Sequence, residues 1–163
     1  ELLSGAPGVP AITLKRKNRT MSTRNRFSDF GMKLMNGIHR TVLTLSGGRL
    51  GWTLGSMPAV ELHTTGRVSG IRRSTLLTAP VHGDGRWVIV ASKGGDDRDP
   101  LWYRNLQATP DAELTIRGRT IPVHTHTAEK AELWPRIVAV NARYAEYQTK
   151  TTRDIPVVIC EER

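Results

Sequence analysis

The segment AVELHTTGRVSGIRRSTLLT, residues 59–78, carries the strongest signal of how this chain folds. Its first seven residues alternate between apolar and polar side chains, GRVSG is a turn sequence, and a second strand-like run follows. Two short strands joined this closely predict an antiparallel hairpin, because parallel strands need a much longer crossover between them.

Similar strand-like segments recur along the chain. They are RSTLLTAPVH, RWVIVAS, AELTI and TIPVHTHT, at residues 73–82, 86–92, 112–116 and 120–127, followed by IPVVICE at 155–161. GDG at 83–85 and RGR at 117–119 supply further hairpin turns. This spacing predicts a meander of five antiparallel strands with a sixth strand near the end.

Two helical segments interrupt the predicted strands. Asp99 is the expected N-cap of a helix that opens with Pro100 and ends before Pro110. The other helix begins near Ala128 and carries apolar residues at helical spacing, with Pro135 expected to kink or restart it. We therefore predict an α+β fold, a six-stranded antiparallel barrel with helices packed on its flanks.

Length and charge predict the domain organisation. A chain of 163 residues suffices for one domain with a hydrophobic core. The net charge of +9 is concentrated near the start, and we expect residues 1–24 to form a basic, disordered arm. Residues 25–163 then form a single domain that opens with an amphipathic helix over 27–46, stopped by Gly47 and Gly48.

Composition excludes several classes of protein. No apolar run approaches the roughly eighteen residues of a membrane span, and no secretory leader is present, so we expect a cytoplasmic protein. The single cysteine, Cys160, excludes an internal disulfide framework and is expected to be a small core residue.

The basic arm lacks an aromatic platform, so no nucleic-acid partner is predicted. Its charge fits a solvated tail or, over residues 10–46, a peripheral membrane contact.

The turn between the first two strands has the composition of an anion site. HTTGRVSGIRRS, residues 63–74, contains three arginines, two glycines and four hydroxyl side chains. Three residues separate Gly66 from Gly70, where the nucleotide phosphate loop has four, and Ile71 follows, which excludes that loop. The segment also lacks the dinucleotide pattern G-x-G-x-x-G, so the residues alone do not identify the anion that it would bind.

Two other clusters of residues suit a flat ligand. Gly94 and Gly95 follow the most apolar strand and allow the backbone to approach a ring closely, with Trp102 nearby as a stacking surface or a core residue. Tyr144 and Tyr147 lie three apart on a predicted helix, which places both phenols on one face, where they could orient a quinone or carbonyl oxygen or simply pack; on the residues alone, packing is favoured.

Other catalytic chemistries lack support in the sequence. His124 and His126 share a strand face, but no third ligand lies near them, so we predict no metal site. The G-x-S-x-G elbow of a serine hydrolase is absent.

Three blocks of sequence together resemble one known family. They are ELHTTGRVSGIRRS, VIVASKGGDDRDPLWYRNLQATPDAEL and LWPRIVAVNARYAEYQTKTTRDIPVVICE. In this order and spacing, over about residues 50–162, they are similar to the deazaflavin-dependent nitroreductase and quinone reductase family of actinobacteria, mycobacteria among them. The resemblance implies a split β-barrel that binds the 8-hydroxy-5-deazaflavin coenzyme F-420 and passes its hydride to an electrophilic acceptor.

The resemblance also implies roles for individual residues. Around the coenzyme's phosphate and anionic tail it places Arg67, Ser69, Arg72 and Arg73. Along the ring it places Ser92, Lys93, Gly94 and Gly95, with Trp102 and Asn105 in support. Over the acceptor it places Tyr144 and Tyr147. Guanidinium groups suit phosphate because they form two charge-assisted hydrogen bonds at once. Tyr144, Tyr147 and Ser92 are the expected catalytic residues, since their hydroxyls could hydrogen-bond the acceptor oxygen.

Three positions depart from the family pattern. Val68 stands where a lysine is usual, which removes one cation from the phosphate site. Thr78 and Asn141 stand where tyrosines line the acceptor pocket of the members that activate nitroimidazoles. We expect coenzyme binding to be retained, and activity on bicyclic nitroimidazoles stays open.

The predicted function is that of an oxidoreductase. Reduced F-420 would donate a hydride to a small-molecule partner, namely a quinone, a nitro compound or an activated alkene. The alternatives are an FMN-binding reductase of the same fold and a non-catalytic module that carries F-420 or lipid. Peripheral location on the inner face of the cell membrane, and pairing as a homodimer, are compatible with each of these.

Overall fold

The computed structural model describes residues 53–54 and 57–163. The predicted arm over 1–24 and the predicted helix over 27–46 lie outside the described residues. The strands are β1 (Thr53–Leu54), β2 (Met57–Thr65), β3 (Arg72–Thr78), β4 (Val81–Gly83), β5 (Arg86–Val90), β6 (Asp111–Ile116), β7 (Arg119–Thr127) and β8 (Val157–Glu162). The helices are the 3-10 turn η1 (Lys93–Gly95), α2 (Leu101–Ala108), α3 (Lys130–Val140) and α4 (Arg143–Thr149).

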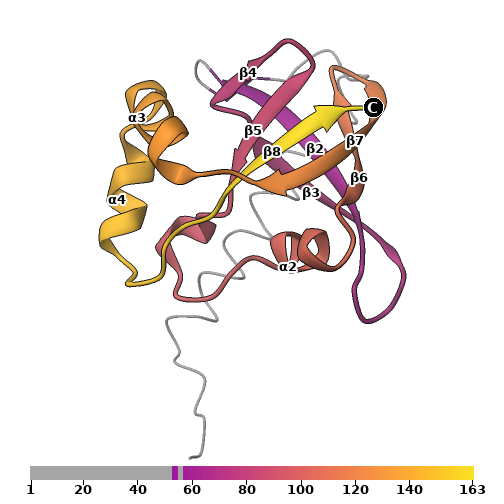
Figure 1. Ribbon diagram of the computed structural model, residues 1–163, viewed down its shortest axis with the longest axis horizontal. Helices are drawn as coiled ribbons and strands as arrows, with labels where there is room; N and C mark the ends of the chain where they lie inside the picture. Colours follow the sequence, from indigo (N-terminus) through magenta and orange to yellow (C-terminus); the bar gives the residue numbers. More distant parts are fainter. Residues whose placement is uncertain (1–52, 55–56) are drawn as a thin grey trace, which may run out of the picture.

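The strands form one curled antiparallel sheet (Figure 1). Its order is β3-β2-β6-β7-β8-β5-β4, and the two-residue strand β1 lies beside the start of β2. Figure 1 shows α3 and α4 on one flank of the sheet and α2 below it. The predicted antiparallel barrel with flanking helices is therefore confirmed, and the described residues form seven full strands in place of six.

The order of the strands differs from the predicted meander. The segment RSTLLTAPVH is not one strand, because it divides at Ala79 and Pro80 into β3 and β4, and proline cannot donate a ladder hydrogen bond. The last strand, β8, lies between β5 and β7, while β2 pairs with β6. Turn sequences predict hairpins, but these long-range pairs decide how the hairpins are ordered in the sheet.

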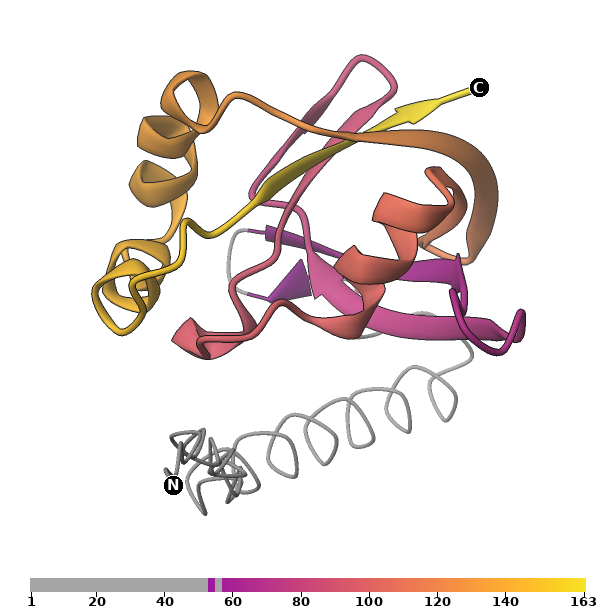
Figure 2. The same ribbon diagram turned by 60° about the horizontal axis from the view of Figure 1, so that its bottom comes forward.

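Alternation along the strands divides the core into two layers. Ile89 and Val158 face the interior of the curled sheet, where Trp102 of α2 also packs. Their neighbours Val88 and Val157 face the other way and pack against α3 and α4, which Figure 2 shows as a pair beside the sheet. The position of β8 thus joins both layers and connects the α3–α4 pair to the barrel.

Cys160 lies in the interior layer, as predicted for a small core residue. Its side chain is fully buried on β8, and this burial raises the pKa of the thiol to about 12. A protonated, inaccessible thiol is a poor nucleophile, so Cys160 has a packing role.

Two details of the predicted helices are corrected. Asp99 does not cap α2, whose N-cap is Pro100; its carboxylate instead accepts a hydrogen bond from Arg153. Pro135, predicted to kink or restart the second helix, does not restart it, because α3 continues through Pro135 and ends at Val140, and α4 begins at Arg143. No helix among the described residues is long and apolar enough to cross a membrane.

Candidate functional site

The β2–β3 turn is a compact, hydrogen-bonded loop. The Gly66 N–H donates to the Ile71 carbonyl at 2.9 Å, and the Gly70 N–H donates to the Gly66 carbonyl at 2.7 Å. The Ser69 hydroxyl accepts a hydrogen bond from the Ile71 N–H at 3.3 Å, so it helps to hold the turn. The predicted anion site therefore lies on a hairpin, and Val68 at its tip is 85% exposed.

The three arginines of this turn have different surroundings. Arg72 forms an ion pair with Glu113 on β6, with an N···O distance of 2.6 Å. Arg73 is the next residue of the strand, so its side chain leaves the opposite face of β3. Arg67 and Arg73 are exposed and form no ion pair among the described residues. They are therefore the two predicted phosphate ligands with guanidinium groups available for an anion.

Asn105 joins the basic turn to α2. Its buried side-chain carbonyl accepts a hydrogen bond from the Arg67 N–H at 3.2 Å, and its amide donates to the Thr64 hydroxyl at 3.0 Å. Asn105 thus positions the turn. Trp102 is 6% exposed and packs in the core, edge to face with Tyr103, so its packing interpretation is confirmed.

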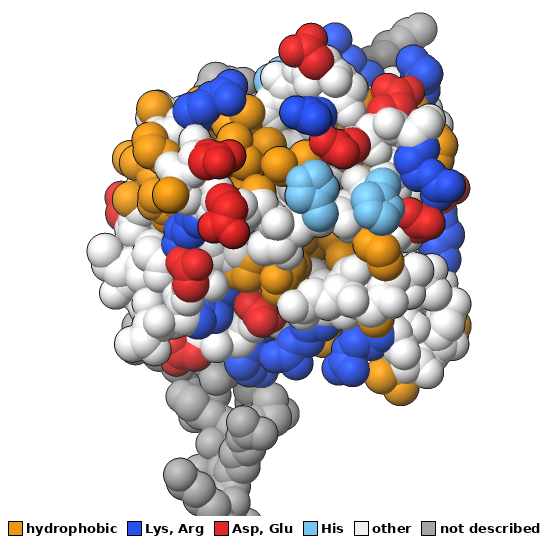
Figure 3. Space-filling model, viewed as in Figure 1, with side chains coloured by type: hydrophobic (Ala, Val, Ile, Leu, Met, Phe, Trp, Pro, Cys, Tyr) orange, Lys and Arg blue, Asp and Glu red, His pale blue; other side chains and the backbone are white. Residues whose placement is uncertain are grey.

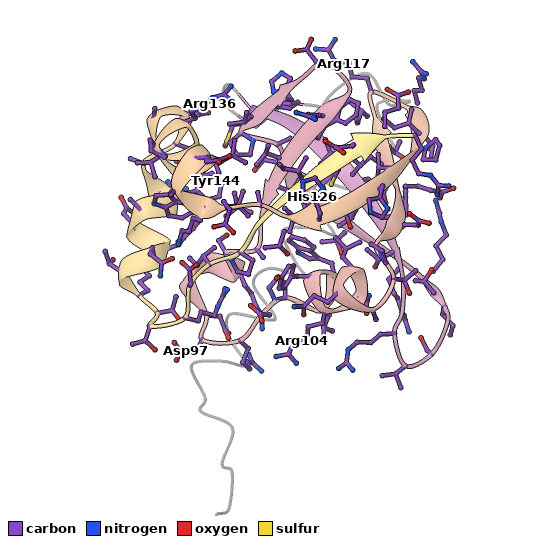
Figure 4. All side chains as sticks on the ribbon, viewed as in Figure 1. Asp97, Arg104, Arg117, His126, Arg136 and Tyr144 are labelled. Carbon is purple, nitrogen blue, oxygen red and sulfur yellow. The ribbon has the colours of Figure 1, made fainter. Side chains whose placement is uncertain are left out.

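Basic side chains also gather outside the hairpin. Figure 3 shows them along the lower edge of the molecule, where Figure 4 places Arg104 of α2. The edge is therefore electropositive around α2, which suits an anionic ligand.

The glycine loop lies against the helix that carries the two tyrosines. Lys93, Gly94 and Gly95 all have positive φ, at 47°, 65° and 82°. A Cβ on Gly95 would lie 2.7 Å from the Tyr147 carbonyl oxygen, whereas a Cβ on Gly94 would meet nothing within 4 Å. Only glycine fits at position 95, and position 94 leaves open space for a flat group. The structure thus brings together two predicted clusters that lie about fifty residues apart in sequence.

Ion pairs between charged residues stabilise the glycine loop. The Asp96 carboxylate lies 3.6 Å from the Lys93 ammonium and accepts hydrogen bonds from the Arg98 guanidinium at 3.0 Å. The hydrogen bond from Arg98 lowers the pKa of Asp96 to about 2, with the charges of Lys93 and Arg98 adding to this effect and burial opposing it. Lys93 is 12% exposed, so this predicted ring-side cation is largely buried beside a carboxylate.

Tyr144 and Tyr147 occupy different environments on α4. Tyr144 is buried, and its hydroxyl lies 3.0 Å from the Thr78 hydroxyl on β3. Burial raises the pKa of Tyr144, partly offset by the hydrogen bond with Thr78 and reinforced by Tyr147. The rings meet edge to face at 6.2 Å, and Tyr147 is half-buried. Tyr144 therefore remains a neutral phenol at neutral pH.

One residue of this site has no sequence signal of its own. Arg153 lies in the segment between α4 and β8, and its side chain is 14% exposed. It donates hydrogen bonds to carbonyl groups on both sides of the glycine loop, including that of Ser92, whose own side chain is half-buried. A single arginine in an irregular connection shows no periodicity or motif, so only the structure reveals it.

A shallow cavity of about 210 Å³ lies elsewhere, between α2 and β7. Its lining residues are Tyr103, Leu106, Gln107, Pro110, Thr125, His126, Thr127 and Val158, and Figure 4 labels His126 above α2. None of these residues belongs to the predicted site. His124 pairs with Asp111, and the described part of the chain holds no cluster of three metal-ligating side chains.

The fold defines a split-barrel protein with flanking helices. The family model described as F420H(2)-dependent quinone reductase matches residues 35–162. An F420H(2)-dependent quinone reductase of Mycobacterium tuberculosis is 40% identical over 140 residues, which cover 82% of this chain and 93% of the relative. The chain belongs to the F420H(2)-dependent quinone reductase family.

Solved structures agree with this assignment. A structure of an F420-H2 dependent reductase, FDR-A, is 39% identical and covers 64% of this chain and 94% of its own, with a TM-score of 0.58. Another, described as a domain-swapped dimer, is 36% identical with a TM-score of 0.60 and covers 75% of this chain and 94% of its own. The predicted reductase activity and the coenzyme F-420 are therefore confirmed at the level of the family.

Replacing Gly95 with alanine should disturb the site more than the same change at Gly94. Positive φ strains both variants by about 1 kcal/mol, but only position 95 adds a steric contact, with Tyr147 and Lys150. We expect G95A to lower the free energy of unfolding by about 2–3 kcal/mol and G94A by about 1 kcal/mol. Urea unfolding measures both, and an equal or larger loss in G94A would contradict this packing.

Replacing Asp96 with asparagine should weaken the fold at neutral pH and not in strong acid. The folded-state pKa of about 2 lies below the usual 3.8, so the carboxylate stabilises the folded protein above about pH 4. That contribution is lost as the pH falls through about 2. We expect D96N to reduce the free energy of unfolding by about 1–2 kcal/mol at pH 7 and by almost nothing at pH 2. Urea unfolding at both pH values tests this, with the exposed neighbour Asp97→Asn as the control (Figure 4).

Proposed function

We propose that this protein binds reduced F-420 between the basic hairpin and the glycine loop and reduces a quinone. The observation that carries the proposal is the contact of Gly95 with α4, since the glycine loop lies there beside two phenols. Family membership supports the coenzyme and the quinone. A nitro compound or an activated alkene would be an acceptor of the same electrophilic kind.

The residues present fit such a coenzyme. Arg67 on the turn and Arg73 near the start of β3 are exposed cations, and each could form charge-assisted hydrogen bonds with a phosphate. Gly94 leaves open space beside the loop, so a flat ring can approach the backbone there. When bound, the coenzyme supplies the hydride, and the protein supplies orientation and the exclusion of water.

The phenols of α4 would act on the acceptor. Negative charge develops on the acceptor oxygen as it is reduced, and a hydrogen-bond donor aimed at that oxygen lowers the barrier. Tyr147 is the better donor of the two, because the Tyr144 hydroxyl already has Thr78 as a partner. Tyr144 stays protonated and supports Tyr147 through its edge-to-face contact. Ser92, half-buried at the start of the loop, is the second candidate donor.

Pairing with a second copy and peripheral membrane attachment through residues 10–46 extend this proposal. The relative described as a domain-swapped dimer supports the first, and the basic composition of that segment supports the second. Light scattering of the pure protein, and sedimentation with anionic liposomes with and without residues 1–46, test these two points. A monomer, or equal sedimentation, would contradict them.

Titration of the pure protein with F-420 and separately with FMN tests the coenzyme. We expect micromolar binding of F-420, no comparable binding of FMN, and a dissociation constant raised about 10- to 100-fold by Arg73→Gln, because one charge-assisted contact is lost. Arg117→Gln, at the opposite end of the molecule, is the control and should leave affinity unchanged (Figure 4). Binding of FMN alone would support the flavin alternative, and binding of neither would contradict a role as a reductase of this kind.

Replacing Tyr147 with phenylalanine should lower turnover with little change in coenzyme affinity. Loss of one oriented donor to a developing oxyanion costs about 100- to 1000-fold in kcat. The control is Tyr103→Phe, which also loses a phenol, in this case one bonded to Thr127 beside α2. Steady-state reduction of 2-methyl-1,4-naphthoquinone measures both, and unchanged kcat in the Tyr147 variant would remove it from the mechanism.

A further inference from the structure

Arg153 is the centre of a hydrogen-bond cluster around the glycine loop. Its Nε donates to the Asp96 carbonyl at 2.8 Å, and its Nη2 donates to the Ala91 and Ser92 carbonyls at 2.8 and 2.9 Å. Its Nη1 donates to the Asp99 carboxylate at 3.1 Å. One guanidinium therefore satisfies three backbone carbonyls, which lie on both sides of the loop, and pairs with one carboxylate.

The backbone of Arg153 is itself fixed to the helix that carries the phenols. The Gln148 side-chain N–H on α4 donates to the Arg153 backbone carbonyl at 2.8 Å, and the Gln148 side-chain oxygen Oε1 accepts from the Ile155 N–H at 3.1 Å. The Arg153 N–H donates to the Thr151 hydroxyl at 3.3 Å, and Lys130 of α3 also donates to Gln148. Arg153 is thus a short, rigid link between α4 and the glycine loop.

This link lies where relative position matters most for the chemistry. Hydride transfer depends steeply on the alignment of donor and acceptor, and an error of about 1 Å can cost about 100-fold in rate. The glycine loop would carry the donor ring, and α4 would carry the phenols at the acceptor. We infer that Arg153 is a positioning residue that sets the coenzyme loop relative to Tyr147 for hydride transfer, an inference that rests on the proposed function.

The geometry of arginine is essential to this role. A lysine would retain the charge and could reach Asp99, but its single ammonium cannot replace a planar fork that serves several carbonyls in different directions. The loop would then lose part of its support, because a buried carbonyl without a partner is unfavourable. Arg153→Lys therefore separates the shape of the side chain from its charge.

The test compares Arg153→Lys with Arg86→Lys, whose arginine pairs with Glu161 away from the loop. Single-turnover oxidation of reduced F-420 by 2-methyl-1,4-naphthoquinone measures hydride transfer, and fluorescence titration measures coenzyme affinity. We expect R153K to slow the transfer about 10- to 100-fold while the dissociation constant changes less than about 3-fold. R86K should match the unmodified protein in both. An unchanged transfer rate in a folded R153K, or a loss confined to coenzyme affinity, would overturn the inference.

A second readout does not depend on the coenzyme. The Gly95 and Asp96 N–H groups are bonded within the loop, to the carbonyls of Ser92 and Lys93, at 2.9 and 3.2 Å. We expect hydrogen–deuterium exchange of these amides to be at least about 10-fold faster in R153K. Unchanged exchange overturns the inference, whereas failure of the unmodified protein to bind F-420 contradicts the proposed function and leaves this readout intact.

If R153K does not fold, Asp99→Asn replaces it in both measurements. This variant removes the charge partner of Arg153 and leaves the loop carbonyls and the arginine in place. We expect a smaller fall in the transfer rate, about 2- to 5-fold, with unchanged coenzyme affinity. If the transfer rate or the exchange rate is unchanged in this variant, the inference is overturned.

Discussion

The pairing of β8 with β5 is the constraint on which the site depends. Val90 is paired with Val157, and the Ala91 N–H donates to the Pro156 carbonyl at 2.9 Å, so the end of β5 and the approach to β8 are held together. The glycine loop leaves from one side of this junction, and the segment after α4 arrives on the other. Close packing of Gly95 against α4, and the hydrogen bonds from Arg153, follow from that shared position.

The glycine loop and the basic hairpin differ in how their charged side chains are paired. Inside the loop, Lys93 and Arg98 both pair with the Asp96 carboxylate, so they stabilise the loop and are poorly placed to bind a second anion. On the hairpin, Arg72 is paired with Glu113, which leaves Arg67 and Arg73 exposed to solvent. The site thus has an end beside the phenols where the loop cations pair with a carboxylate, and an end on the hairpin with exposed arginines. A coenzyme with a flat ring and an anionic tail matches this arrangement.

Local patterns in the sequence predicted most of the elements and few of their contacts. The alternation in AVELHTT and the glycines of the turns are signals that lie within a few consecutive residues. The hairpins, the buried Cys160 and the glycine loop were therefore all predictable. The insertion of β8, the use of Asp99 by Arg153 and the pairing of Arg72 depend on residues far away in the chain. The family resemblance brought the loop and the tyrosines into one site, but only coordinates reveal Arg153 as the link between them.

The central claim is that the coenzyme lies between the basic hairpin and the glycine loop, beside α4. A crystal structure of the protein with bound F-420 measures this directly. The account predicts the deazaflavin ring in contact with Gly94 and its phosphate within hydrogen-bonding distance of Arg67 or Arg73. A ring bound in the cavity between α2 and β7, next to His126, would contradict it.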